Sequence, residues 1–204
     1  MILDPQHLIQ SGGLLLIAIM IFAESGMMVG FVFPGDTLLI SAGVFAASGK
    51  ISLSLVILVA ALASVAGDNV GYLIGKKAGP KLFTKKDEDS LIFRQEYIDK
   101  SEKFFDKYGS KTMLLAHFVP VVRTFVPVIA GAGEMHHGKF SLFDAIGDIS
   151  WAVLISLLGY YVGSKIPGLD RYILILVAIA VIISFSPVVY HLILRRRKKK
   201  ANRR

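Results

Sequence analysis

The sequence predicts an all-α integral membrane protein: an inverted repeat with two opposed re-entrant hairpins, about four transmembrane helices and one amphipathic helix. Hydrophobic residues make up 54% of the 204 residues, and the mean hydropathy of +0.61 is rare for a soluble domain. A helix needs about 20 residues to cross ~30 Å of hydrocarbon. Four apolar runs reach that length with their flanks: 14–22, 53–67, 151–163 and 172–185. We treat residues 1–204 as a single membrane domain.

The first half, 1–79, opens with MILDPQHLIQ, which lacks the positive region and cleavage site of a signal peptide. The first apolar run is therefore expected to stay in the protein. A broken apolar segment follows, FAESGMMVGFVFPGDTLLISAG, with Glu24, Pro34, Gly35 and Asp36 inside it. Proline removes a helix hydrogen bond, and Pro-Gly favours a turn. Non-helical backbone at membrane depth must be buried in protein or line a wet cavity, so 22–45 is predicted to be a re-entrant hairpin.

A row of glycines marks the next helix, predicted near 52–75. The four residues recur at every fourth position and fall on one helical face: Gly67, Gly71, Gly75 and Gly79. Small residues at this spacing let helix backbones approach closely in lipid. We interpret the row as a packing surface.

Residues 80–112 differ from their surroundings, with eight basic and seven acidic residues. Their apolar side chains fall roughly on a helical stripe, which indicates an amphipathic helix on the membrane surface or a solvated linker helix. Nearby lysines place the segment in the cytoplasm. Lys50 and residues 165–171 are then expected on the far side.

The second half, 113–194, opens with a second broken segment, HFVPVVRTFVPVIAG. It holds His117, Pro120, Arg123 and Pro127 and predicts a re-entrant hairpin over 113–135. The chain ends in RRRKKKANRR, 195–204, with eight basic residues. Because this tail follows an apolar span, we interpret it as a cytoplasmic segment touching anionic lipid head groups, not as a nucleic-acid site. Both termini are expected in the cytoplasm.

The two halves share a pattern at a constant offset of 88 residues, which includes a common GYxxGxK motif. The six matched positions of the first half are Ala42, Gly43, Gly71, Tyr72, Gly75 and Lys77. Matches among common residues can be coincidental, but the constant offset favours a repeat. With 76–112 in the cytoplasm, the helices near 52–75 and 141–163 run in opposite directions. That is the inverted plan of many secondary transporters, whose site lies where the repeats meet.

The charged residues of the two hairpins predict the site. A charge at the bilayer centre costs at least ~2.5–3.5 kcal/mol, so it faces the interior and finds partners. Arg123 is expected to pair with Glu24 and Asp36, either to bind phosphate through its planar guanidinium or to pin the hairpins together. The carboxylates suit proton coupling. Asp68 and Asp148 are further candidates, although each lies near enough to a helix end to be merely hydrated.

These residues resemble the DedA family of bacterial membrane proteins, related to the SNARE-associated/VTT-domain proteins. The resemblance covers roughly 10–165 and rests on Glu24, FPGD at 33–36 and FVPVVRTFVPVIAG at 118–131. It implies opposed re-entrant hairpins and movement of lipids across the bilayer, with undecaprenyl phosphate and phosphatidylethanolamine as associated substrates, and proton-dependent stress tolerance in some members. By position it implies that Glu24 and Asp36 are functional carboxylates and Arg123 a functional arginine.

His117 departs from the family pattern, which commonly has arginine there. Two interpretations remain open: a hydrogen-bonded wall residue, or a group whose titration makes an anion site depend on pH. On the second, activity falls as His117 loses its proton, and His117→Arg flattens the dependence.

The leading hypothesis is a translocase for a phosphate-bearing lipid, with or without proton coupling. The alternatives are a proton-dependent small-solute or ion antiporter and a non-transporting scaffold. An enzyme is not expected, because no Ser/His/Asp pattern or phosphate loop stands out. His136-His137 lacks metal-pair spacing, so no metal or cofactor is predicted. The sequence does not predict an oligomeric state.

Overall fold

The computed structural model describes residues 5–26, 35–82, 112–166, 168–169 and 172. Within these ranges the regular structure is entirely helical, which confirms the all-α prediction. The helices are α1 (Pro5–Gly26), α2 (Gly35–Ala47), α3 (Leu53–Leu82), α5 (Thr112–Ala116), α6 (Pro120–Ala132) and α7 (His137–Lys165). Pro34, most of the predicted amphipathic segment, the last predicted span and the basic tail lie outside the described residues.

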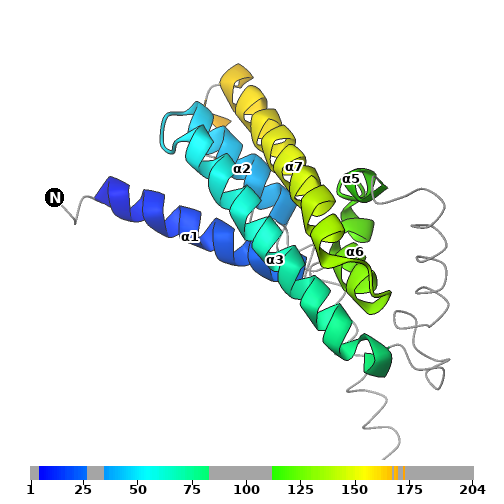
Figure 1. The fold of residues 1–204 in the computed structure, drawn as a ribbon. Helices are drawn as coiled ribbons and strands as arrows, with labels where there is room; N and C mark the ends of the chain where they lie inside the picture. The colour runs from blue at the N-terminus through cyan, green and yellow to red at the C-terminus, as the bar shows by residue number, and fades with distance from the viewer. Residues whose placement is uncertain (1–4, 27–34, 83–111, 167, 170–171, 173–204) are drawn as a thin grey trace, which may run out of the picture.

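Two long helices, α3 and α7, lie side by side and run in opposite directions (Figure 1). Among the described helices, these two are long and apolar enough to cross a membrane, over Leu53–Ala78 and His137–Lys165. In α1 the apolar stretch is shorter, Gly12–Gly26. Helix α2 packs along α7 and α6 packs along α3, whereas α5 lies against α7 and α1 crosses the bundle at a steep angle (Figure 1).

The distribution of polarity in this bundle is the reverse of that in a soluble protein. Large apolar side chains are exposed along the long helices, for example Leu62 at 62% and Leu142 at 60%. Charged side chains are buried instead, including Glu24 at 4% and Asp144 at 0%. Contiguous apolar exposure of this kind marks a surface that water does not cover. The described bundle is built to face lipid.

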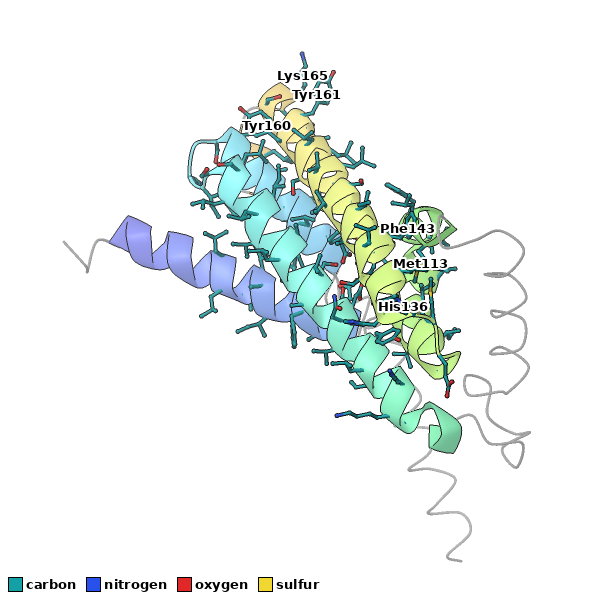
Figure 2. The ribbon with its side chains drawn as sticks, in the orientation of Figure 1. Met113, His136, Phe143, Tyr160, Tyr161 and Lys165 are labelled. Atoms are coloured by element: carbon teal, nitrogen blue, oxygen red, sulfur yellow. The ribbon has the colours of Figure 1, made fainter. Side chains whose placement is uncertain are left out.

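One end of α7 carries the residues that favour a membrane–water boundary. Tyr160, Tyr161 and Lys165 gather there (Figure 2), and the Lys165 ammonium lies 5.6 Å from the Tyr161 ring centroid. Tyrosines are enriched at the head-group level because their rings are apolar and their hydroxyls polar. This end of α7 is therefore suited to the interface, while the rest of the helix is suited to hydrocarbon.

Glycines allow two helix pairs to pack backbone against backbone. Between α3 and α6, a Cβ on Gly75 would overlap the Val128 carbonyl, and one on Gly131 would overlap the Tyr72 carbonyl. The contact between α2 and α7 is of the same kind, as the surroundings of Gly43 and Gly159 show. Each short helix thus packs on the long helix of the other half of the chain.

The glycine row of α3 contacts two helices in succession. Gly67 packs on α1, where an added Cβ would lie 2.8 Å from the Ser25 Cβ. Gly71 touches both neighbours, since its Cβ would lie 3.3 Å from Pro127 of α6 and 3.4 Å from the Ser25 carbonyl oxygen. Gly75 packs on α6, because the three atoms nearest to its added Cβ all belong to Val128. Gly79 also lies in α3, but its contacts fall outside the described part of the chain.

Some predicted boundaries differ from the observed ones. Helix α3 does not end near 75 but runs to Leu82, so residues 80–82 belong to it and not to the amphipathic segment. The helices α2 and α6 have 13 residues each, about 20 Å at 1.5 Å per residue. Both are shorter than the hydrocarbon core, as half of a re-entrant hairpin must be, and the re-entrant assignment stays a prediction.

Candidate functional site

The first candidate site is built around Arg123, near the start of α6, and is called the arginine site below. One guanidinium nitrogen, Nη2, donates to Glu24 Oε1 at the end of α1. The other, Nη1, lies 3.3 Å from Asp36 Oδ1 at the start of α2. Two consecutive helices, α1 and α2, and the distant helix α6 therefore meet at one side chain.

Gly35 fixes the Glu24 carboxylate. Its backbone N–H donates to Glu24 Oε2 at 2.8 Å, so the carboxylate caps the N-terminus of α2, where the helix dipole favours negative charge. The approach requires glycine, because a Cβ at position 35 would overlap that same carboxylate. Glu24 is thus held by a backbone N–H on one oxygen and by Arg123 on the other.

Trp151 of α7 completes the arginine site. The Arg123 guanidinium carbon lies 4.1 Å from the centroid of the Trp151 ring, a cation–π contact. The indole N–H donates to Asp36 Oδ1 at 3.0 Å. The two carboxylates differ in access: the Asp36 side chain is 36% exposed, against 6% for Glu24. Asp36 is the open side of the site.

A second group of charges lies between α3, α7 and the turn after α5. It consists of Asp68, His117, Asp144 and Asp148, named the aspartate cluster here. His117 Nε2 lies 3.3 Å from Asp144 Oδ1, 3.5 Å from Asp148 Oδ1 and 3.6 Å from Asp68 Oδ2. All four residues are buried.

The His117 ring is oriented by its surroundings. Its Nδ1 lies 2.7 Å from the carbonyl oxygen of Met113 on α5. Met113 and Phe143 lie where α5 meets α7 (Figure 2), and both belong to an apolar cluster there. On the α7 side, Gly147 makes room for the ring, since its Cβ would lie within 2.9 Å of three imidazole atoms.

A chain of hydroxyls joins the two groups of charges. Ser64 donates to Asp148 Oδ1. The Ser25 hydroxyl, one residue after Glu24, lies 3.2 Å from the Ser64 hydroxyl. Since the Ser64 proton is already used, Ser25 is the donor in that second bond. The end of α1 is thereby connected to the aspartate cluster.

The structure places the predicted site residues in two separate groups. Glu24 and Asp36 meet Arg123, but His117 belongs to the aspartate cluster. The alternative that Asp68 and Asp148 are merely hydrated at helix ends is wrong, because they are 3% and 1% exposed. Of the predicted breaks, Gly35 begins α2, Pro120 begins α6 and Pro127 lies inside α6.

Asp144 and the contacts of Trp151 were not predicted. A signal for both exists in the sequence, since Asp144, Gly147, Asp148 and Trp151 fall at spacings of three and four residues. That spacing places them on one face of a helix, and all four are buried on α7. A polar stripe of this kind inside an apolar helix indicates an interior face of a membrane protein.

The apolar exterior and charged interior define the class, a helical membrane protein with buried ionisable groups. Comparison with known families gives the family itself: the VTT domain model matches residues 33–161. The chain belongs to the DedA family of VTT-domain membrane proteins, which confirms the predicted resemblance.

Individual relatives agree with this assignment. Protein DedA of Escherichia coli (strain K12) is 36% identical over 181 residues, which cover 88% of this chain and 81% of that protein. An uncharacterized membrane protein of Mycobacterium tuberculosis is 37% identical over 194 residues, covering 91% and 84%. Inner membrane protein YqjA of Escherichia coli is 29% identical over 155 residues, covering 76% and 69%. No solved structure matches the chain.

Proposed function

We propose that this protein is a lipid translocase of the bacterial inner membrane that moves a phosphate-bearing lipid, either undecaprenyl phosphate or a phospholipid. The observation that supports this most is the unequal pair of carboxylates on Arg123: Glu24 is buried and held by Gly35, whereas Asp36 is partly exposed. Both termini are proposed to be cytoplasmic. The proposed role is transport, with membrane lipids as partners and no catalysis.

The geometry suggests how a head group binds. An incoming phosphate replaces Asp36 at Nη1 of Arg123, because this carboxylate is the accessible partner. Guanidinium binds phosphate through two parallel hydrogen bonds, which a lysine ammonium does not reproduce. Trp151 keeps the guanidinium plane in place during the exchange, since it stacks on Arg123.

Proton coupling extends the same step. When phosphate displaces Asp36, that carboxylate keeps its hydrogen bond from Trp151 but loses its arginine partner inside an apolar bundle. An ionisable group left in such a place must find a new partner or become neutral. Uptake of one proton by the carboxylates of the arginine site for each lipid bound would couple transport to the proton gradient.

The helix packing supports an inverted repeat as the frame of this site. Residues 40 and 128 correspond at the offset of 88. The carbonyls of Ile40 and Val128 each lie against a glycine of the opposite half. The glycines are Gly159 and Gly75, which are one helical turn apart in the repeat. In this arrangement α2 and α6 are the inner arms of the two hairpins, and the arginine site lies between them.

The proposal is tested with purified protein in liposomes that contain a fluorescent phospholipid or labelled undecaprenyl phosphate. Transbilayer movement is measured with and without a pH gradient. We expect wild type to move the lipid, and Arg123→Ala, Arg123→Lys and Glu24→Gln to lose most of that activity. Lys139→Gln is the matched control, because Lys139 is exposed at the start of α7.

Each alternative function gives a distinct result. Uptake of soluble phosphate or of protons without lipid movement would identify an antiporter. No transport of either kind by a folded wild-type protein would support a scaffold. Normal lipid movement by Arg123→Ala would refute the proposed role of the arginine site.

A further inference from the structure

The aspartate cluster holds three carboxylates and, unlike the arginine site, no permanently charged cation. Its three carboxylates have a formal charge of −3 when ionised, and a protonated His117 would still leave −3 + 1 = −2. Their side chains are between 0% and 4% exposed. Buried charge is paired, bound to a cation or neutralised by protons. Ser64 supplies one hydrogen bond to Asp148, and neither oxygen of Asp144 has a hydrogen-bond partner in the described part of the chain.

The orientation of His117 adds an independent observation. A carbonyl oxygen can only accept, so the 2.7 Å contact with Met113 requires the proton on Nδ1. In the neutral ring the Nε2 lone pair then points at three carboxylates. Nε2 has no hydrogen-bond partner among the described residues, although it is buried and aimed into the cluster. Metal-binding histidines almost always donate their other N–H to a backbone carbonyl or a carboxylate in this way.

The distances also fit ligands around a small cation. Metal–nitrogen and metal–oxygen bonds of about 2.0–2.2 Å in a tetrahedron place the ligand atoms about 3.4 Å apart. The three distances from His117 Nε2 to carboxylate oxygens are 3.3, 3.5 and 3.6 Å. A charge-assisted hydrogen bond would be about 2.7–2.9 Å. All four ligand atoms lie within 4.8 Å of one another, so small rotations of the aspartates complete the set.

We propose that Asp68, His117, Asp144 and Asp148 form a binding site for one divalent transition-metal cation. One imidazole with three carboxylates favours Zn²⁺ or Mn²⁺ over the all-oxygen cations Mg²⁺ and Ca²⁺, because imidazole suits transition metals. The ion reduces the formal charge of the cluster from −3 to −1. It also ties α3 and α7 to the turn between α5 and α6.

The surroundings of the cluster are suited to holding these ligands in place. Ser64 orients Asp148 through its hydroxyl. Gly147 leaves the space that the imidazole fills, and its replacement by alanine would push the ring out of line. Such supporting groups commonly change metal affinity by 10–100-fold when they are replaced.

The test uses the full chain, purified in detergent, stripped with a chelator and titrated separately with Zn²⁺ and Co²⁺. Bound metal is measured by mass spectrometry, and the visible absorption of Co²⁺ reports its coordination. We expect one equivalent of metal per chain, a four-coordinate Co²⁺ spectrum and a higher melting temperature with Zn²⁺. His117→Gln and Asp144→Asn should each weaken binding at least tenfold.

Two controls separate this site from adventitious binding. A double variant, His136→Gln with His137→Gln, removes exposed histidines outside the cluster and should bind as wild type does. Glu24→Gln removes a buried carboxylate of the arginine site and should also leave binding unchanged. Folding of each variant is checked by size-exclusion chromatography.

The proposal is overturned if stripped wild type binds less than one equivalent, or if folded His117→Gln binds as tightly as wild type. Loss of binding in the His136/His137 control would overturn it as well. If both ligand variants fail to fold, the wild-type stoichiometry and Co²⁺ spectrum decide. A well-folded wild type without tight binding would mean that protons alone balance the charge.

Discussion

Gly35→Ala is the most direct test of how the arginine site is assembled. The new Cβ would occupy the place of the Glu24 carboxylate, and the three atoms nearest to it all belong to that carboxyl group. Glu24 must therefore move, which breaks its bond to the Gly35 N–H and shifts its contact with Arg123. All other side chains of the arginine site are the same as in the wild type.

The magnitude follows from the lost contacts. A hydrogen bond to a charged acceptor contributes about 1.5–3 kcal/mol. Replacing glycine by alanine in a helix returns up to about 1 kcal/mol. The net loss is about 1–2 kcal/mol, which lowers the melting temperature by roughly 2–8 °C for a chain of this size. Since Glu24 no longer orients Arg123, we expect lipid transport to fall at least about tenfold.

Two measurements check this expectation: melting by fluorescence-detected size exclusion, and lipid movement in proteoliposomes. Gly12→Ala is the matched control, because nothing lies within 4 Å of the Cβ it would add to α1. A second test places Gly35→Ala in a Glu24→Ala background. There the overlapping atoms are gone, so the further loss of stability should vanish. Wild-type melting and transport in Gly35→Ala would refute the reasoning.

Three further predictions concern packing, the indole and topology. Gly75→Ala forces a methyl group onto the backbone of α6 and should cost about 1–3 kcal/mol, whereas Gly71→Ala, with its nearest atom at 3.3 Å, should cost less in the same melting assay. Trp151→Phe removes one hydrogen bond and weakens a cation–π contact; we expect about 1–2 kcal/mol of lost stability and slower lipid movement, and an unchanged protein would exclude the indole from the site. In this cysteine-free chain, Ser90→Cys should resist an impermeant thiol reagent added outside cells and Lys50→Cys should react; the opposite labelling would reverse the topology.

The fold class could be predicted because bilayer spanning imposes a length and a composition that a sequence displays directly. The contact of Arg123 with Glu24 could be anticipated for a similar reason: a charge in an apolar segment needs a partner, and the other predicted hairpin offered two. The glycine row of α3 indicated close packing, although its spacing did not reveal that Gly67 and Gly75 contact different helices.

What could not be predicted depends on the turn between α5 and α6. His117 stands six residues before Arg123, where the family pattern commonly has arginine, and this correspondence suggested a shared anion site. The chain leaves α5 at Ala116 and enters α6 at Pro120, which sends the imidazole toward α3 and α7 instead. Asp144 was missed because two residues of its cluster, Asp68 and His117, come from other elements, α3 and the turn after α5. No spacing within one segment shows that they meet.

The glycine contacts between halves have a mechanical consequence. Helices joined backbone to backbone slide past each other poorly, so we expect α2 with α7 and α3 with α6 to move as two rigid bodies, each drawn from both halves of the chain. The contact between Arg123 on α6 and Asp36 on α2 joins one body to the other. The aspartate cluster also joins them, because its three aspartates lie on α3 and α7. Alternating access would then open this seam on one side of the aspartate cluster at a time. A disulfide engineered between α2 and α7 should leave transport intact, and one between α3 and α7 should stop it.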